Sequence, residues 1–337
     1  MSKTMKKRLV IIGSGPAGLS CALSALKNGI PKENILVLER EEELGGTLNL
    51  CIHAGFGKDN KTGTELATEL ADKVRNAGIT CMTSTTVLSI DKRKIITLIS
   101  PELGYTKITA EAIVLATGCR ERSRGGLSIG GTRPAGILSA GTAQRFINLE
   151  GYMPGAKTVV VGTTDLALVI ARRITLEGGQ VVFVCDSKKK PQSERVKVGE
   201  CLDYFNIPLK LHTTITRIFG KDRIEGVEIA ELDKKGRPIK ETKERIECDS
   251  LVYSCGFIPE NELANSLGIE MRQSTHGPRT TRKMETSIDG IFSCGNSRMI
   301  HEDVDDIILD GKKAGKFVAE HLKSLKEDKK KKKEKKQ

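Results

Sequence analysis

One short segment near the N-terminus constrains the fold more than any other part of this sequence. Residues 9–12 are all apolar, the pattern G-x-G-x-x-G follows at residues 13–18, and a helical pattern continues to residue 28. A buried strand that turns through glycines into a helix opens a dinucleotide-binding βαβ unit. Gly13 permits the tight turn, Gly15 lets the backbone approach a pyrophosphate, and Gly18 allows helix and strand to pack closely.

The elements expected after such a turn follow in order. Residues 35–38 form a second apolar strand that ends at Glu39, where an acid can accept a hydrogen bond from a ribose hydroxyl. A third apolar strand, at residues 112–115, leads into an Ala-Thr-Gly turn, and residues 287–296 have the pattern of a strand followed by a turn and a helix. The two ends of the chain are therefore predicted to form one nucleotide-binding domain.

The same order of signals begins again in the middle of the chain. An apolar strand ends at Gly162, a helical pattern covers residues 166–176, and a further strand ends at Asp186. Thr164 stands where a glycine normally lets the pyrophosphate come close, so this second fingerprint leaves nicotinamide binding open. Asp186 favours NAD, whereas the lysines at residues 188–190 favour the 2′-phosphate of NADP.

Composition excludes several classes of function. No stretch of 18 uninterrupted apolar residues occurs, and the first apolar run is broken by glycines and lacks a cleavage site, so we expect a cytoplasmic protein. The nine cysteines never occur as C-x-x-C, which argues against a redox dithiol, an iron–sulfur ligand set and a metal site. Aromatic residues make up only 4% of the chain, so no nucleic-acid partner is expected.

The C-terminal segment is compositionally distinct. Residues 323–337 carry nine lysines against three acids, which accounts for half of the net charge of +12. Such a segment cannot bury a core and is predicted to be disordered. Its plain interpretation is a solvated end, and the alternative is weak contact with an anionic membrane or with RNA.

Several longer runs resemble a known family. They are residues 45–53 (GGTLNLCIH), 118–122 (GCRER), 131–136 (GTRPAG), 140–146 (AGTAQRF), 150–155 (EGYMPG), and the late Cys294, Gly295 and Asn296 with His301 and Asp305. The chain resembles two-dinucleotide-binding flavoproteins of the pyridine nucleotide-disulfide oxidoreductase superfamily. Within it, the chain is similar to the NAD(P)/FAD-dependent oxidoreductases associated with anaerobic-type glycerol-3-phosphate dehydrogenases and to α subunits of sarcosine, opine and proline dehydrogenases.

The resemblance implies a domain assignment. The fold class is α/β, with two Rossmann-like domains that each combine a parallel sheet, helices and an antiparallel β crossover. Residues 1–120 and 250–322 would form a discontinuous FAD-binding domain, residues 121–249 an inserted NAD(P)-binding-like domain, and residues 323–337 the disordered tail. Most of the superfamily has Asp where this chain has Asn296, whose amide carries no charge toward the diphosphate.

The resemblance also implies the site. FAD would be held by Gly13, Ser14, Gly15, Pro16, Ala17, Gly18, Glu39, Arg40, Gly46, Thr47, Ala116, Thr117, Gly118, Gly295 and Asn296, and NAD by Gly162 and Asp186. No catalytic residue is assigned. Cys51 and His53 are candidates near the expected flavin, where they would tune the ring or shuttle a proton, and the alternative is that both have packing and hydrogen-bonding roles.

The implied activity is hydride or electron transfer between NAD(P)H and the flavin, with electrons passed to a partner dehydrogenase or iron–sulfur subunit of a glycerol-3-phosphate dehydrogenase-like complex. Because Cys51 has no second cysteine nearby in the sequence, disulfide reduction is not expected. The alternative hypothesis is a flavin-holding electron-transfer or assembly subunit whose nicotinamide site has degenerated, and it rests on Thr164.

Overall fold

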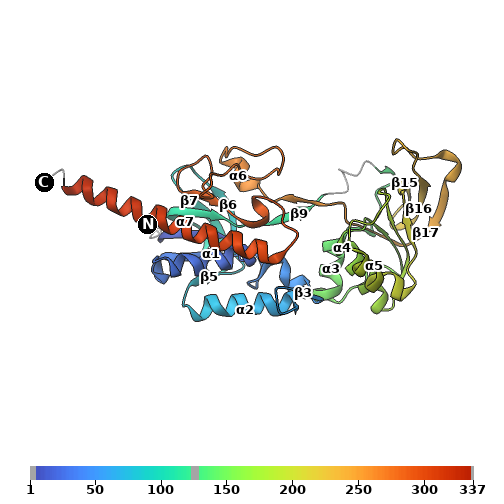
Figure 1. Cartoon of the computed structure of the whole chain (residues 1–337), viewed down its shortest axis with the longest axis horizontal. Coiled ribbons are helices and arrows are strands. Elements are labelled where there is room, and N and C mark those ends of the chain that lie inside the picture. The colour runs from blue at the N-terminus through green and yellow to red at the C-terminus, as the bar shows by residue number, and fades with distance from the viewer. Residues whose placement is uncertain (1–4, 123–128, 335–337) are drawn as a thin grey trace. The chain divides into compact units, whose positions relative to one another are not determined.

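The computed structural model describes residues 5–122 and 129–334, with side chains described as far as residue 327. It divides into two compact units: unit 1 comprises Met1–Arg120 and Ile258–Gln337, and unit 2 is Glu121–Phe257 (Figure 1). The chain crosses between them at β9 (Cys119–Glu121) and β19 (Phe257–Pro259), which pair with each other.

Unit 1 is built on a mixed sheet. Its strands are β1 (Met5–Ile12), β2 (Ile35–Leu38), β5 (Thr80–Met82), β6 (Thr86–Ile90), β7 (Ile95–Ser100), β8 (Gly104–Leu115) and β20 (Ile291–Ser293). Its helices are α1 (Pro16–Lys27), α2 (Gly63–Asn76), α6 (Glu262–Ser266) and α7 (Val304–Glu334), with short turns η1 (Lys32–Asn34), η2 (Gly46–Leu50) and η7 (Gly295–Ser297) and a hairpin of β3 (Ala54–Phe56) and β4 (Lys61–Thr62). Strands β5, β2, β1, β8 and β20 run parallel, and β6 and β7 extend the sheet antiparallel from β8.

Unit 2 contains a second parallel sheet and an antiparallel one. The parallel sheet has the order β11 (Ile137–Ser139), β18 (Ser250–Tyr253), β12 (Lys157–Val161), β13 (Gln180–Asp186) and β14 (Leu209–Leu211). The other sheet contains β10 (Gly130–Gly131), β15 (Thr213–Gly220), β16 (Ile224–Glu231) and β17 (Glu244–Glu247). The helices are α3 (Ala140–Arg145), which continues as η4 (Phe146–Glu150), α4 (Asp165–Leu176) and α5 (Arg195–Cys201), with short turns η5 (Asp203–Phe205) and η6 (Lys240–Thr242).

The two parallel sheets repeat one topology. The order β5-β2-β1-β8, with β20 also on β8, corresponds strand for strand to β14-β13-β12-β18-β11. The predicted α/β class with two Rossmann-like domains and antiparallel additions is confirmed. A strand buried on both faces reads as a continuous apolar run, which is why the central strands are recognisable in the sequence.

The strand pairing corrects one predicted boundary. The first domain is predicted to resume at residue 250, but β18 lies between β11 and β12 in the sheet of unit 2. It occupies there the position that β8 has in unit 1. The polypeptide returns to unit 1 only at Ile258.

Central strand β1 places its side chains alternately in two cores. Leu9 and Ile11 belong to the core under α1, α2 and α7, while Val10 and Ile12 belong to the core on the opposite face of the sheet. Three of these four residues have no exposed surface, and Ile12 is 6% exposed. The sheet is therefore fixed between two packed layers, and its carboxyl edge has a defined position relative to α1.

Helix α7 packs closely along α1 (Figure 1). A Cβ on Gly311 would lie 2.1 Å from the carbonyl oxygen of Ala17, and a Cβ on Gly315 would lie 2.3 Å from that of Cys21. Only glycine permits the backbones to come this close. The last helix of the chain therefore holds the helix that begins at the first fingerprint.

The lysine-rich segment differs from its prediction. Residues 323–337 are predicted to be disordered, but α7 continues without a break to Glu334, and residues 335–337 lie outside the described range. Nucleation is the costly step of helix formation, and lysine and glutamate are good helix formers. A helix already anchored as far as Leu322 is therefore extended at little cost.

Within the described ranges, no helix combines the length and apolarity needed to cross a bilayer.

We expect Gly315→Ala to destabilise the protein by about 1–3 kcal/mol, because the added methyl group must push α7 away from the Cys21 carbonyl. Urea unfolding followed by circular dichroism measures the change. Gly199 in α5 is the matched control, since its Cβ would meet nothing within 4 Å, and Gly199→Ala should raise stability by about 0.5–1 kcal/mol. Equal effects of the two substitutions would contradict the close-packing argument.

Candidate nucleotide-binding site

The residues predicted to hold FAD gather at one edge of the unit 1 sheet. They follow the carboxyl ends of four parallel strands: residues 13–18 follow β1, Glu39 follows β2, the Ala116-Thr117-Gly118 turn follows β8, and Gly295 and Asn296 follow β20. Ligands of open α/β sheets bind outside this edge.

The three fingerprint glycines have distinct environments. A Cβ on Gly13 would lie 2.3 Å from the carbonyl oxygen of Ala116, and a Cβ on Gly18 would lie 1.9 Å from that of Gly13. At Gly15 an added Cβ would meet nothing within 4 Å, and this N-cap residue leaves α1 without a side-chain cap. Two glycines therefore permit internal packing, and the third leaves the first-turn amides of α1 available to an anion.

A buried carboxylate fixes the turn. Glu39 Oε2 accepts hydrogen bonds from Ser14 N at 2.8 Å and Ser14 Oγ at 2.6 Å, and its Oε1 accepts one from Glu41 N. Gly45 N donates to Ser14 O at 3.0 Å. Glu39 is only 6% exposed, so these bonds hold the ends of β1 and β2 and the following loop in one geometry.

The Gly45–Gly46 segment lies against the fingerprint. Both glycines have positive φ, and a Cβ on Gly46 would be 3.0 Å from the Cα of Gly15. Gly46 and Thr47 thus open η2 directly beside the turn. Arg40, by contrast, is exposed and pairs with Glu41 at 3.6 Å.

At the other side of the edge, three charged or titratable residues support the turn at Gly295 and Asn296. Asp310 on α7 is 5% exposed, and its Oδ2 accepts a hydrogen bond from Gly295 N at 2.8 Å. Arg298 forms two hydrogen bonds with the same carboxylate. His301 N donates to Asn296 Oδ1 at 2.9 Å, and the amide nitrogen of the same side chain, Nδ2, donates to Cys119 Sγ at 3.6 Å.

Asp310 and Arg298, which support this turn, are not singled out by the sequence patterns, although a signal for Asp310 exists. The buried residues of α7 include positions 314, 318 and 322, so Asp310 lies on the same helical stripe, one turn earlier. An acid on an apolar stripe requires a specific partner, and here the partners are Gly295 N and Arg298.

Cys51 and His53 lie in the segment that follows η2. Cys51 Sγ donates to Thr47 O at 3.5 Å, and the ring of His53 lies 5.2 Å from that of Phe56. These contacts suit packing and hydrogen bonding. A catalytic role for either residue stays a prediction.

The second fingerprint keeps part of the same design. A Cβ on Gly162 would lie 2.1 Å from the carbonyl oxygen of Ser254, and Asp186 accepts hydrogen bonds from Thr163 N and Thr163 Oγ1. Gly162 and Asp186 are thus placed like Gly13 and Glu39. Thr164, however, is the N-cap of α4, and its side chain accepts a hydrogen bond from Ala167 N.

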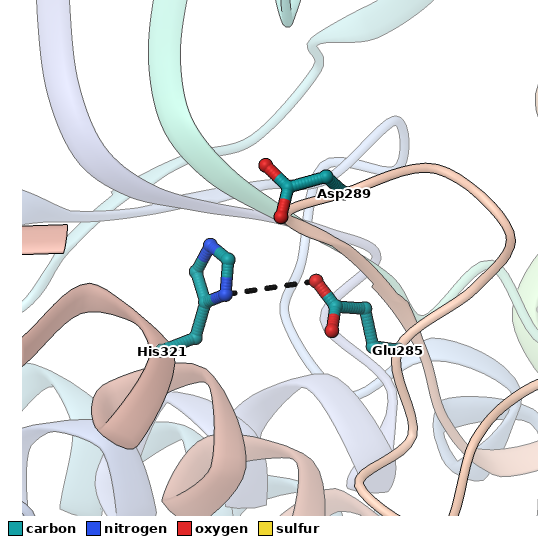
Figure 2. Close-up of side chains that lie close together, drawn as sticks. All are labelled: Glu285, Asp289 and His321. Carbon is teal, nitrogen blue, oxygen red and sulfur yellow. Dashed lines mark ion pairs between the residues drawn. The ribbon is translucent and has the colours of Figure 1, made fainter. Parts of the chain in front are cut away.

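A separate cluster in unit 1 brings together Glu285, Asp289 and His321, whose ligand atoms lie within 4.8 Å of one another (Figure 2). His321 Nδ1 lies 3.6 Å from Glu285 Oε1, and the His321 ring packs edge-on against Phe292. Carboxylates and imidazole are metal ligands, but Lys94 Nζ already lies 3.8 Å from Asp289 Oδ2 and donates to Asp289 O. The ammonium group of Lys94 therefore balances part of the negative charge of Glu285 and Asp289.

Comparison with known proteins identifies the family of the chain. Residues 7–310 match the family model described as pyridine nucleotide-disulphide oxidoreductase. The chain belongs to this family. All nine of its cysteines are nevertheless free thiols in the structure.

Two relatives and one solved structure illustrate the similarity. One opine oxidase polypeptide of Agrobacterium tumefaciens (strain Ach5) is 24% identical over 86% of this chain, which spans only 60% of that relative's length. The 34.2 kDa protein in the rubredoxin operon of Clostridium pasteurianum is 26% identical over 88% of this chain and 91% of its own. Thioredoxin reductase of Lactococcus lactis has the same fold, with a TM-score of 0.75 at 22% identity over 94% of this chain and 99% of its own.

If unit 1 binds FAD, as the sequence predicts, Gly15→Thr should abolish FAD retention while leaving the protein folded. Gly15 has φ −64° and ψ 178°, which any residue adopts, so the new side chain would not strain the backbone but would occupy the space beside the first-turn amides. The flavin absorbance of the protein purified in the presence of FAD measures retention, and circular dichroism checks the fold. Full retention by the folded variant would show that this turn does not face the diphosphate.

We expect Cys255 to be nearly inert toward iodoacetamide in the folded protein at pH 8. Burial, followed by the carboxylates of Asp186 and Glu121, raises the pKa of this thiol to about 11, so roughly one molecule in a thousand carries the thiolate at that pH. Alkylation should accelerate as the pH rises toward 11. Peptide mass spectrometry follows the reaction, with the urea-unfolded chain as control, and equal rates in both states would contradict the shift.

Proposed function

We propose that this chain is an FAD-dependent oxidoreductase and that unit 1 holds the flavin nucleotide. The observation that carries the proposal is the N-terminus of α1, which has no side-chain cap and faces open space at Gly15. The positive end of a helix with free amide donors is suited to a diphosphate. The buried and hydrogen-bonded Glu39 stands where a ribose hydroxyl would be bound.

The remaining residues of the edge would position the cofactor. The Gly45–Gly46 segment brings backbone close to Gly15, and the Thr117 hydroxyl ties the Ala116-Thr117-Gly118 turn to Glu260 O at 2.7 Å. Asn296, held through its Oδ1 by His301 N, would present its Nδ2 as a donor to phosphate or ribityl oxygens. When bound, FAD supplies the electron-transfer chemistry, and the protein supplies orientation and electrostatics.

The partner of this flavin is proposed to be a dehydrogenase or iron–sulfur subunit, as in a glycerol-3-phosphate dehydrogenase-like complex. Support comes from the opine oxidase relative, which is named as one subunit of an enzyme and is considerably longer than this chain. The free cysteines support electron transfer without a disulfide intermediate.

Family membership favours NAD(P)H as the other redox substrate. The residues of unit 2 argue against it. Gly162 and Asp186 retain the positions expected for a nucleotide site, whereas Thr164 caps α4 with its own hydroxyl. This observation favours the second candidate function, a flavin-holding electron-transfer or assembly subunit.

Reconstitution tests the flavin proposal. We expect the 337-residue protein to bind about one FAD per chain, since unit 1 offers one complete fingerprint. Dithionite should bleach the bound flavin under anaerobic conditions, and an electron-accepting dye should restore its absorbance. Gly15→Thr protein is the matched control, and failure of the wild-type protein to retain FAD would overturn the proposal.

A further inference from the structure

We propose that unit 2 is closed to pyridine nucleotides because its own side chains occupy the place of the pyrophosphate, and that the flavin therefore receives its electrons from the dehydrogenase or iron–sulfur subunit of the proposed function, which is oxidised in turn, rather than from NAD(P)H. The closure concerns unit 2 by itself. Only the conclusion about the flavin rests on the proposed function of unit 1.

The repeated topology supplies an internal reference. Gly13 meets the Ala116 carbonyl, and Gly162 meets the Ser254 carbonyl in the same way. The Ser14 backbone and hydroxyl donate to Glu39, and Thr163 donates twice to Asp186. By this correspondence, Thr164 in unit 2 is at the position equivalent to Gly15 in unit 1, and Ser254 is at the position equivalent to Ala116.

At the helix N-terminus the two units differ. Gly15 and Thr164 have nearly the same backbone conformation, with φ/ψ of −64°/178° and −68°/159°. Gly15 adds no side chain, so the first-turn amides of α1 have no side-chain acceptor there. Thr164 Oγ1 accepts from Ala167 N at 3.3 Å and shares a hydrogen bond with Ser254 Oγ at 2.7 Å. The threonine therefore takes the amide and the space that a phosphate oxygen would use.

The loop after β13 closes the turn further. Ser193 N donates to Thr163 O at 2.9 Å, which repeats the bond from Gly45 N to Ser14 O in unit 1. Where unit 1 has a glycine, however, Ser193 carries a hydroxyl that donates to Asp165 at the start of α4. Gln192 N also donates to Thr163 Oγ1 at 3.0 Å. The loop is thus tied to the fingerprint by its own polar groups.

The acid that would bind the ribose is also more heavily occupied. Asp186 Oδ2 accepts hydrogen bonds from Thr163 N, Thr163 Oγ1 and Gln192 Nε2, and its Oδ1 accepts one from Lys188 N. From the described part of the chain, Glu39 accepts one bond fewer, two at Oε2 and one at Oε1. A ribose hydroxyl approaching Asp186 would therefore compete with Gln192, in addition to the displacement required at Thr164.

Direct binding tests the closure without relying on enzymatic activity. We expect the FAD-loaded wild-type protein to show no saturable binding of NADH or NADPH by isothermal titration calorimetry up to about 1 mM, the upper end of ordinary Michaelis constants. The double variant Thr164→Gly with Ser254→Ala recreates the glycine and alanine found at these positions in unit 1. Its affinity for NADH or NADPH should exceed that of the wild type by at least about tenfold. Glycine is tolerated at an N-cap, so the variant should fold. Thr163→Ser, which copies Ser14 and keeps the hydroxyl that bonds Asp186, is the matched control and should behave like wild type.

Anaerobic spectroscopy tests the consequence for the flavin. NADH and NADPH should leave the wild-type flavin oxidised, while dithionite bleaches it. Saturable binding of either nucleotide by the wild-type protein at any concentration up to about 1 mM, or equal affinities of the wild type and the double variant, would overturn the closure. Loss of FAD from a wild type that still fails to bind NADH would overturn the proposed function and leave the closure standing.

Discussion

The approach of α1 to the end of β1 is the constraint on which the rest of unit 1 depends. With Gly18 against the Gly13 carbonyl, the first turn of the helix lies directly over the strand end. The Glu39 carboxylate then fixes the turn from the side of β2, and Asp310 on α7 fixes the Gly295 turn beyond β8. Because α7 in turn packs on α1 through Gly311 and Gly315, the site and the core are parts of one packing arrangement.

Much of this arrangement could be predicted from local patterns. The strands before Gly13, Glu39, Gly118 and Asp186 are largely buried on both faces, so each appears as a short apolar run ending at a recognisable turn. Glycine spacing then identifies which turn is suited to a nucleotide. These signals are local, because each lies within a few residues of the position it specifies.

What the sequence does not reveal depends on partners distant along the chain. Asp310 acquires its role only when α7 lies beside the Gly295 turn, and the prediction for β18 is wrong because an apolar run does not show which strand it pairs with. Thr164 is visible as a departure from the fingerprint, but its bond to Ser254 joins residues 90 positions apart. Gln192 and Ser193 give no signal, since polar residues in a lysine-rich loop are typical of an exposed segment.

The different caps of α1 and α4 also imply a difference in how the two units obtain their stability. Relative to the glycine at the same position of α1, a threonine N-cap stabilises its helix by roughly a few tenths of a kcal/mol, whether or not a ligand is present. Under the proposed function, unit 1 leaves the corresponding contribution to the nucleotide that it binds, and a ligand that binds only the native state stabilises it in proportion to the logarithm of its free concentration. The lifetime of unit 1 in a cell would then follow the supply of its cofactor, whereas unit 2 would keep its structure through cofactor shortage.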